Sequence, residues 1–88
     1  MSEKKQQQGR EIAFVETYNE DVKKTIERAF LRRGVSYLIK VDKVAKIKQG
    51  LFGSKIKYTF QINRYQQEEA KAAVEEKNLD ENTIRFLT

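Results

Sequence analysis

The chain has 88 residues, no cysteine, no histidine and a formal net charge of +5. Because cysteine and histidine supply disulfides, thiolate nucleophiles, most zinc ligands and the side chain that titrates near neutral pH, most familiar catalytic and metal centres cannot be built here. We therefore expect one small non-enzymatic domain with a modest core, no cofactor and no metal site.

The first ten residues are polar, include three consecutive glutamines and show no apolar periodicity. This pattern is typical of disorder, so residues 1–10 are predicted to be a disordered lead-in and residues 11–88 the folded domain. No apolar run approaches the ~20 residues of a membrane span, and residues 1–10 lack the apolar stretch of a secretory signal. We therefore expect a cytoplasmic protein.

The first half of the domain is predicted to form a strand and then a helix. Residues 12–17 are rich in β-formers and apolar on both alternating faces, which favours a central strand. A helix over residues 20–33 follows, because Asn19 is a good N-cap, apolar side chains recur at helical spacing and Gly34 is typical of a helix end.

Apolar residues then recur at every second position in residues 35–48 and again in residues 56–62. This periodicity predicts two long strands, and glycines in the connection at residues 49–54 predict that the strands form a hairpin. Lys43 interrupts the apolar row. We expect there either a β-bulge or the point where the strand leaves the body of the domain.

The chain ends with a second helix and a short strand. Asn63 and Gln66 have the spacing of a capping box, Asn78 suits the end of the helix, and residues 83–87 alternate as a strand. The complete order predicts an α+β, ferredoxin-like βαββαβ fold, in which a four-stranded antiparallel sheet has both helices on one face, its first strand inside and a long hairpin toward an edge.

Charge is concentrated in the hairpin, because residues 34–64 contain seven bases and one acid. A basic two-stranded ribbon can contact nucleic-acid phosphates, but lysines on a sheet edge also prevent unwanted strand pairing. The candidate anion or nucleic-acid contacts are Lys40, Lys43, Lys46, Lys48, Lys55, Lys57 and Arg64. Alternation directs Tyr58 and Phe60 to the opposite face from Lys55 and Lys57, so we expect core positions for these two aromatic residues.

The predicted connection contains two large apolar residues, Leu51 and Phe52, where polar residues are usual. They either fold back onto the ribbon or form an anchor for a protein partner, since such side chains supply much of an interface's affinity. Contact with an anionic membrane surface is a further alternative. The glutamate pairs at 68–69 and 75–76 are predicted to be solvated on a helix face, and no phosphate-binding glycine loop is present.

The element order, the Arg-Gly-Val-Ser-Tyr exit from the first helix at residues 33–37, the long hairpin and the helix sequence at residues 66–73 resemble the small signal-transducing proteins of the PII-like superfamily, over about residues 11–87. The resemblance implies a ferredoxin-like body that self-associates through its open sheet face. It also implies that residues 43–57 occupy the place of the effector loop. The nucleotide-binding loop and the tyrosine-bearing loop tip are absent, so ATP binding and covalent switching are not implied.

Together these patterns favour a small regulatory or binding module that contacts a protein or small ligand and forms a homo-oligomer. The alternative is a nucleic-acid-binding protein that uses the basic ribbon at residues 40–64.

Overall fold

The computed structural model describes residues 11–48 and 51–88, and the side chains of residues 11–44 and 55–88. The elements in chain order are β1 (Glu11–Thr17), α2 (Glu20–Arg33), β2 (Tyr37–Lys48), β3 (Leu51–Asn63), the 3-10 turn η1 (Arg64–Gln66), α3 (Gln67–Glu75) and β4 (Arg85–Phe86). The strands form one antiparallel sheet in the order β2-β3-β1-β4. The predicted α+β class is confirmed, and β1 lies inside the sheet as expected. The predicted lead-in at residues 1–10 lies outside the described residues.

Helix α2 has the ends that its sequence predicts. The side chain of Asn19 accepts a hydrogen bond from the backbone N–H of Val22 at 3.0 Å, which satisfies one of the free donors of the first turn. At the other end Gly34 adopts φ +70°, a left-handed conformation that glycine reaches without strain. The backbone N–H of Val35 then donates to the carbonyl of Phe30 at 2.9 Å, and the chain turns into β2.

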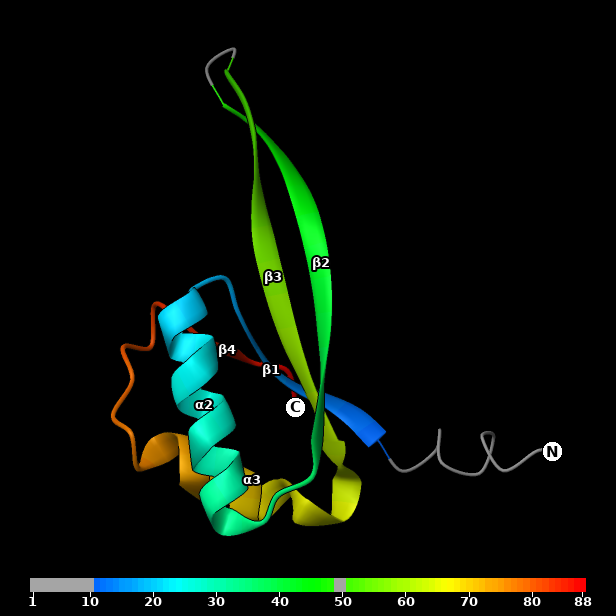
Figure 1. The fold of residues 1–88 in the computed structure, drawn as a ribbon, viewed down its shortest axis with the longest axis vertical. Coiled ribbons are helices and arrows are strands. Elements are labelled where there is room, and N and C mark those ends of the chain that lie inside the picture. Colours follow the sequence, from blue (N-terminus) through cyan, green and yellow to red (C-terminus); the bar gives the residue numbers. More distant parts are fainter. Residues whose placement is uncertain (1–10, 49–50) are drawn as a thin grey trace, which may run out of the picture.

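One hydrophobic core joins the sheet to both helices (Figure 1). Phe30 of α2 lies at its centre, with ring centroids 5.6 Å from Phe60 on β3, 5.7 Å from Tyr37 on β2 and 6.5 Å from Phe14 on β1. Small residues on α3 complete the cluster and allow close packing. The buried residues are Phe14, Val15, Ile26, Ala29, Phe30, Val35, Phe60, Ile62, Ala70, Ala73 and Val74.

Strand β1 contains a bulge that the sequence did not predict. Its pairing with β3 shifts between Ala13 and Val15, so both Phe14 and Val15 are buried, although strict alternation would place them on opposite faces. Ala13 is exposed and Glu16 lies opposite Thr59, on the face away from the core. The prediction of apolar residues on both faces of this strand holds only for Ala13, because Val15, which was expected beside it, lies in the core with Phe14.

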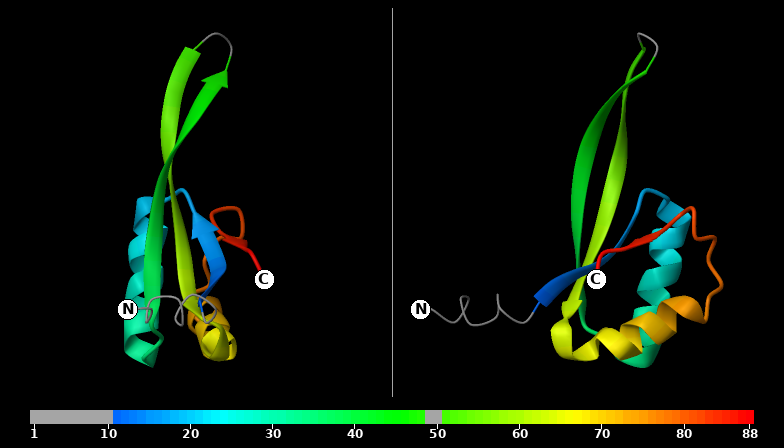
Figure 2. Two further views of the ribbon diagram at one scale, coloured as in Figure 1. Left: turned by 90° about the vertical axis from the view of Figure 1, so that its right-hand side faces the viewer. Right: turned by 180° about the vertical axis from the view of Figure 1, so that it is seen from behind.

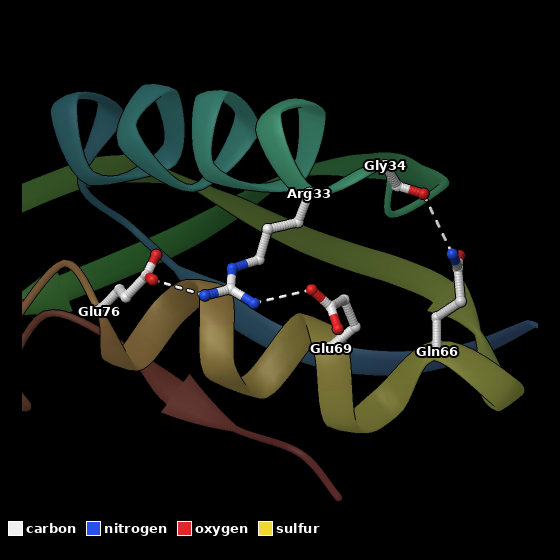
Figure 3. Close-up of polar contacts among 5 residues, drawn as sticks. All are labelled: Arg33, Gly34, Gln66, Glu69 and Glu76. Atoms are coloured by element: carbon white, nitrogen blue, oxygen red, sulfur yellow. Dashed lines mark hydrogen bonds and ion pairs between the residues drawn. The ribbon is translucent and has the colours of Figure 1, made fainter.

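The predicted capping box is also wrong in part. Asn63 accepts a hydrogen bond from the backbone N–H of Tyr65 at 2.9 Å, as a cap should, but it caps the 3-10 turn η1. Gln66 does not complete the box, because its side chain accepts from Ser36 N–H at 3.0 Å and donates to the Gly34 carbonyl at 3.1 Å (Figure 3). The long-range contacts displace the local motif, and α3 begins only at Gln67.

The last strand is shorter than predicted. Thr83 belongs to a turn, because its backbone N–H and its hydroxyl both donate to the Asp80 carbonyl, at 2.9 and 2.6 Å. The buried Thr17 hydroxyl donates to the Thr83 carbonyl at 2.6 Å and holds this turn against β1. Residues 85–86 form the strand pairing with β1, and just beyond them the Leu87 N–H donates to the Phe14 carbonyl at 2.7 Å.

Candidate functional site: the β2–β3 arm and the open sheet face

The most distinctive feature of the molecule is a ribbon that projects from the body. Pairing between β1 and β3 ends at Thr17 and Tyr58, whereas β2 and β3 remain paired from Asp42 and Lys57 outward to Lys48 and Leu51. We call residues 42–57 the arm. Figure 1 and both views in Figure 2 show it extending well past the helices and the other strands.

The position of Lys43 is explained by this projection. The β2–β3 register runs without a shift through the pair of Lys43 and Ile56, so there is no bulge at this point. Lys43 is instead the second residue of β2 beyond the last level at which β1 supports the sheet. Of the two expectations for Lys43, departure from the body is the one that the pairing supports.

The arm keeps the alternating sequence of a half-buried hairpin, but no described element forms a layer over it. None of its described side chains, at residues 42–44 and 55–57, is buried. In contrast, Phe60 and Ile62 on the body half of the same strand are fully buried. A two-stranded ribbon is only marginally stable in water, so an unsupported one of this length is expected to gain from a contact outside its own chain.

The connection between the strands is shorter than predicted. Leu51 pairs with Lys48 and Phe52 with Ile47, so both are residues of strand β3 and not of a six-residue loop. The glycine at 53 also belongs to the strand, opposite Lys46, and glycine is tolerated there although it weakens a strand. Leu51 and Phe52 are the first two residues of β3, at the outer end of the described β2–β3 pairing. The proposed anchoring role of their side chains lies outside the described part of the structure.

The pairing register places three of the six candidate lysines on one side of the sheet. Lys40 lies opposite Thr59, and Lys57 lies opposite Asp42, on the face turned away from the helices, which we call the open face. Lys55, opposite Val44, continues this row, and both Lys40 and Lys55 are exposed.

The remaining candidates are distributed differently. Lys43 pairs with Ile56 and belongs to the other face. Lys46 and Lys48 are strand positions opposite Gly53 and Leu51. Arg64 lies beyond the strand, at the start of η1, so it does not belong to the arm.

An acid that sequence reasoning missed lies on the open face. Glu16 of β1 is 3.9 Å from Lys57 on β3 and 3.9 Å from Arg85 on β4, and its side chain is only 12 % exposed. Lys40, Thr59, Glu16 and Arg85 thereby form a row across all four strands. The bulge in β1 decides that Glu16 belongs to this face, so alternation counted from residue 12 could not have placed it. The open face of the body is consequently of mixed charge, and the excess of positive charge lies toward the arm.

Two cation–π contacts support the base of the arm. The Lys55 ammonium lies 4.5 Å from the Tyr18 ring centre, just beyond the end of β1, and the Lys23 ammonium of α2 lies 5.4 Å from the ring of Tyr58. Phe60 is buried in the core, as predicted, whereas Tyr58 is only half-buried and does not belong to the core cluster. Their rings are thus not platforms for stacking bases.

A polar contact ties α2 to the start of β2. Glu27 accepts a hydrogen bond from the Tyr37 hydroxyl at 3.0 Å and lies 2.7 Å from the Lys23 ammonium. The hydrogen bond with Lys23, supported by that from Tyr37, lowers the pKa of the Glu27 carboxyl. Burial, followed by the bond to Glu27, raises the pKa of Tyr37. Each partner is satisfied within the cluster, so its role is to fix the helix to the sheet.

The two helices are joined by Arg33, whose guanidinium donates to Glu76 at 2.5 Å and to Glu69 at 2.7 Å (Figure 3). The Arg33 guanidinium lowers the pKa of the Glu76 carboxyl. Glu69 and Glu76 are seven residues apart and therefore share one side of α3. All four glutamates of the two pairs are exposed, as predicted, and Glu69 and Glu76 in addition form ion pairs with Arg33 that the sequence did not predict.

Two shallow hollows lie beside β4 on the described surface. One, of about 310 Å³, is lined by Phe14, Phe86 and Thr88 and by Gln67, Glu68 and Lys71 of α3. The other, of about 240 Å³, lies between the end of α3 and Ile84. The smaller hollow falls below the usual size of a ligand pocket and the larger only reaches it. Neither brings together the described residues that the sequence singled out.

Within the described residues no group of His, Cys, Asp or Glu side chains has the arrangement of a metal site. No described helix is long and apolar enough to cross a membrane. No protein-family model, curated protein or solved structure matches this chain.

Proposed function

We propose that this protein is a non-enzymatic regulatory or binding module of the ferredoxin-like kind, which contacts a protein partner through the β2–β3 arm. The element order and the strand order β2-β3-β1-β4 support the ferredoxin-like description. A relationship to the PII-like superfamily remains a prediction, and under it the arm takes the place of the effector loop.

The observation that carries the proposal is that no other described part of the chain forms a supporting layer over the arm. The core ends near Tyr58, and beyond it β3 is paired only with β2. Ordering backbone costs about 1–2 kcal/mol per residue, which body residues recover by burial and the described arm residues do not. An arm that is costly to maintain and has no buried side chain among its described residues is well suited to binding a partner.

A nucleic acid is the second candidate partner, and the charge of the arm favours it. Lys40, Lys43 and Lys55 are exposed, and only Asp42 adds a negative charge within residues 34–64. Binding of this kind would contact phosphates and would weaken steeply with salt. The body supplies no aromatic residue for base stacking at the central open-face positions, which are Ala13, Glu16, Thr59 and Gln61.

The two candidates are separated by capture of partners from the source cell, with and without nuclease. We expect Phe52→Ala to lose a protein partner that survives nuclease treatment, while its melting temperature barely changes. A large fall in melting temperature would instead mean that the Phe52 side chain stabilises the fold. If this variant still captures the partner, Phe52 is not part of the contact.

For the nucleic-acid candidate, Lys46, Lys48, Lys55 and Lys57 are replaced together by Gln. The matched control replaces Lys24, Arg28, Lys71 and Lys77 by Gln, which lowers net charge equally but leaves the arm intact. If the arm binds nucleic acid, the first variant loses retention of DNA or RNA at ~50 mM salt and the control keeps it. Absence of retention by the unaltered protein rules this candidate out.

A further inference from the structure

The outer edge of β2 is the longest open strand edge in the described sheet. β2 has twelve residues and is paired only with β3, so the outward backbone groups of this edge have no partner strand. Two apolar side chains on it, Leu38 and Val41, are 53 % and 58 % exposed. Edges of this kind attract a further strand unless their side chains oppose it.

We infer that this edge binds the same edge of a second copy, with the two β2 strands antiparallel and related by a two-fold axis at Val41. The two four-stranded sheets then form one continuous sheet of eight strands. The inference does not depend on which partner the arm binds.

The side-chain sequence of β2 is complementary to itself around Val41. In this pairing Lys40 lies opposite Asp42 of the second copy, and Asp42 lies opposite Lys40, so symmetry creates two opposite-charge pairs. Leu38 lies opposite Val44 on the same face, and the two Val41 side chains meet on the other. Exposed apolar residues are covered and each charge receives a partner.

The same sequence opposes the neighbouring registers. A two-fold axis at residue 40 would place the two Lys40 ammonium groups against each other. An axis at residue 42 would place the two Asp42 carboxylates together. A two-fold axis perpendicular to the sheet pairs only residues that lie on the same face. These two registers, with the axis moved by one residue in either direction, are therefore the nearest alternatives. The charges of Lys40 and Asp42 therefore favour the axis at Val41 over the two registers next to it.

This arrangement also gives the arm a support. The strands are antiparallel about Val41, so residues 42–45 of one copy run beside residues 37–40 in the body of the other. Half of the otherwise unsupported ribbon is then bordered by a second sheet. The two arms point in opposite directions, which leaves the outer end of each arm beyond the shared edge.

Charge reversal tests the pairing, with self-association measured by sedimentation between ~1 and ~200 µM. We expect the unaltered protein to dimerise and Lys40→Glu or Asp42→Lys alone to weaken dimerisation by about tenfold to a hundredfold, because each creates two like-charge pairs. An equal mixture of the two single variants restores dimerisation, since both cross-pairs are then of opposite charge. The double variant also restores it. Lys57→Glu, which changes charge on β3 and not on the β2 edge, is the matched control.

Cross-linking tests the register in a chain that has no native cysteine. Under mild oxidation Val41→Cys should form a disulfide-linked dimer, because directly opposite residues have Cα atoms about 4.5–5.5 Å apart. Leu38→Cys alone should not cross-link, but a mixture with Val44→Cys should. A monomer at every concentration, or efficient cross-linking of Leu38→Cys to itself, would overturn the inference.

Discussion

The body and the arm share two strands but differ in what covers them. In the body, α2 and α3 close over one face of the sheet, and Phe60 on β3 is enclosed by Phe30 and Tyr37. In the arm, Ile56 lies four residues earlier on the same face of the same strand and is only half-buried. The alternation of side chains along a strand therefore indicates strand pairing and the face on which each residue lies. Burial depends instead on how far the helices extend over that face.

The largest expected difference between the two regions is the response to truncation of an apolar side chain. Phe60→Ala should lower the free energy of unfolding by about 3–5 kcal/mol, because it leaves a cavity beneath α2. Ile56→Ala should lower it by less than about 1 kcal/mol, because the half-buried side chain is replaced largely by water. Urea denaturation of both variants measures the two values.

Similar losses for the two variants would mean that the arm is covered in solution. Repeating the denaturation at low and high protein concentration would show whether a second copy is responsible, since only a covering subunit makes the loss at Ile56 depend on concentration.

The body could be predicted from sequence wherever a local signal acted alone. Asn19 and Gly34 set the ends of α2, and alternation placed Phe60 and Ile62 in the core. Prediction failed where a distant contact determined the outcome. Gln66 has the spacing of a capping residue, yet it binds the backbone at Gly34 and Ser36, thirty or more residues away in sequence.

The site was predicted less completely than the fold. The hairpin and its basic charge follow from alternation and residue counts, but Glu16 does not, because a bulge reverses the facing of β1 between Ala13 and Val15. The projection of the arm depends on the length of β1, since β3 loses support where β1 ends at Thr17. Only Lys43 hinted at this boundary in the sequence.

Amide hydrogen exchange sharpens the comparison within a single strand. Amides of β3 at residues 59–62 should exchange through global unfolding, while those at residues 55–57 should open locally and exchange at least about tenfold faster. The measurement uses dilute protein, so that self-association does not contribute to the difference in exchange rates. At high concentration the outward amides of β2 should gain protection if a second copy pairs with its edge, and the arm amides of β3 should not.

Uniform protection along β3 in dilute protein would contradict the distinction between body and arm. Protection of β3 arm amides that appears only at high concentration would instead place the second copy on the arm's other edge.

The smallest expected effect concerns acid stability, which the ion pairs of the body should control. The pKa values of Glu27 and Glu76 are lowered from 4.5 by Lys23 and Arg33. Each pair therefore stabilises the fold above about pH 4.5, and this contribution is lost as pH falls through the lowered folded pKa.

Arg33→Gln removes the partner of Glu76 and Glu69 and should lower the melting temperature slightly near pH 7, with a smaller difference from the unaltered protein near pH 3. Lys55→Gln makes the same charge change on the arm and should leave the acid dependence of melting unchanged. If Lys55→Gln flattened the pH dependence as much as Arg33→Gln, net charge would be the cause and not the contact between α2 and α3. A flattening specific to Arg33→Gln would assign this part of the acid sensitivity to the junction of the two helices, the layer that the arm lacks.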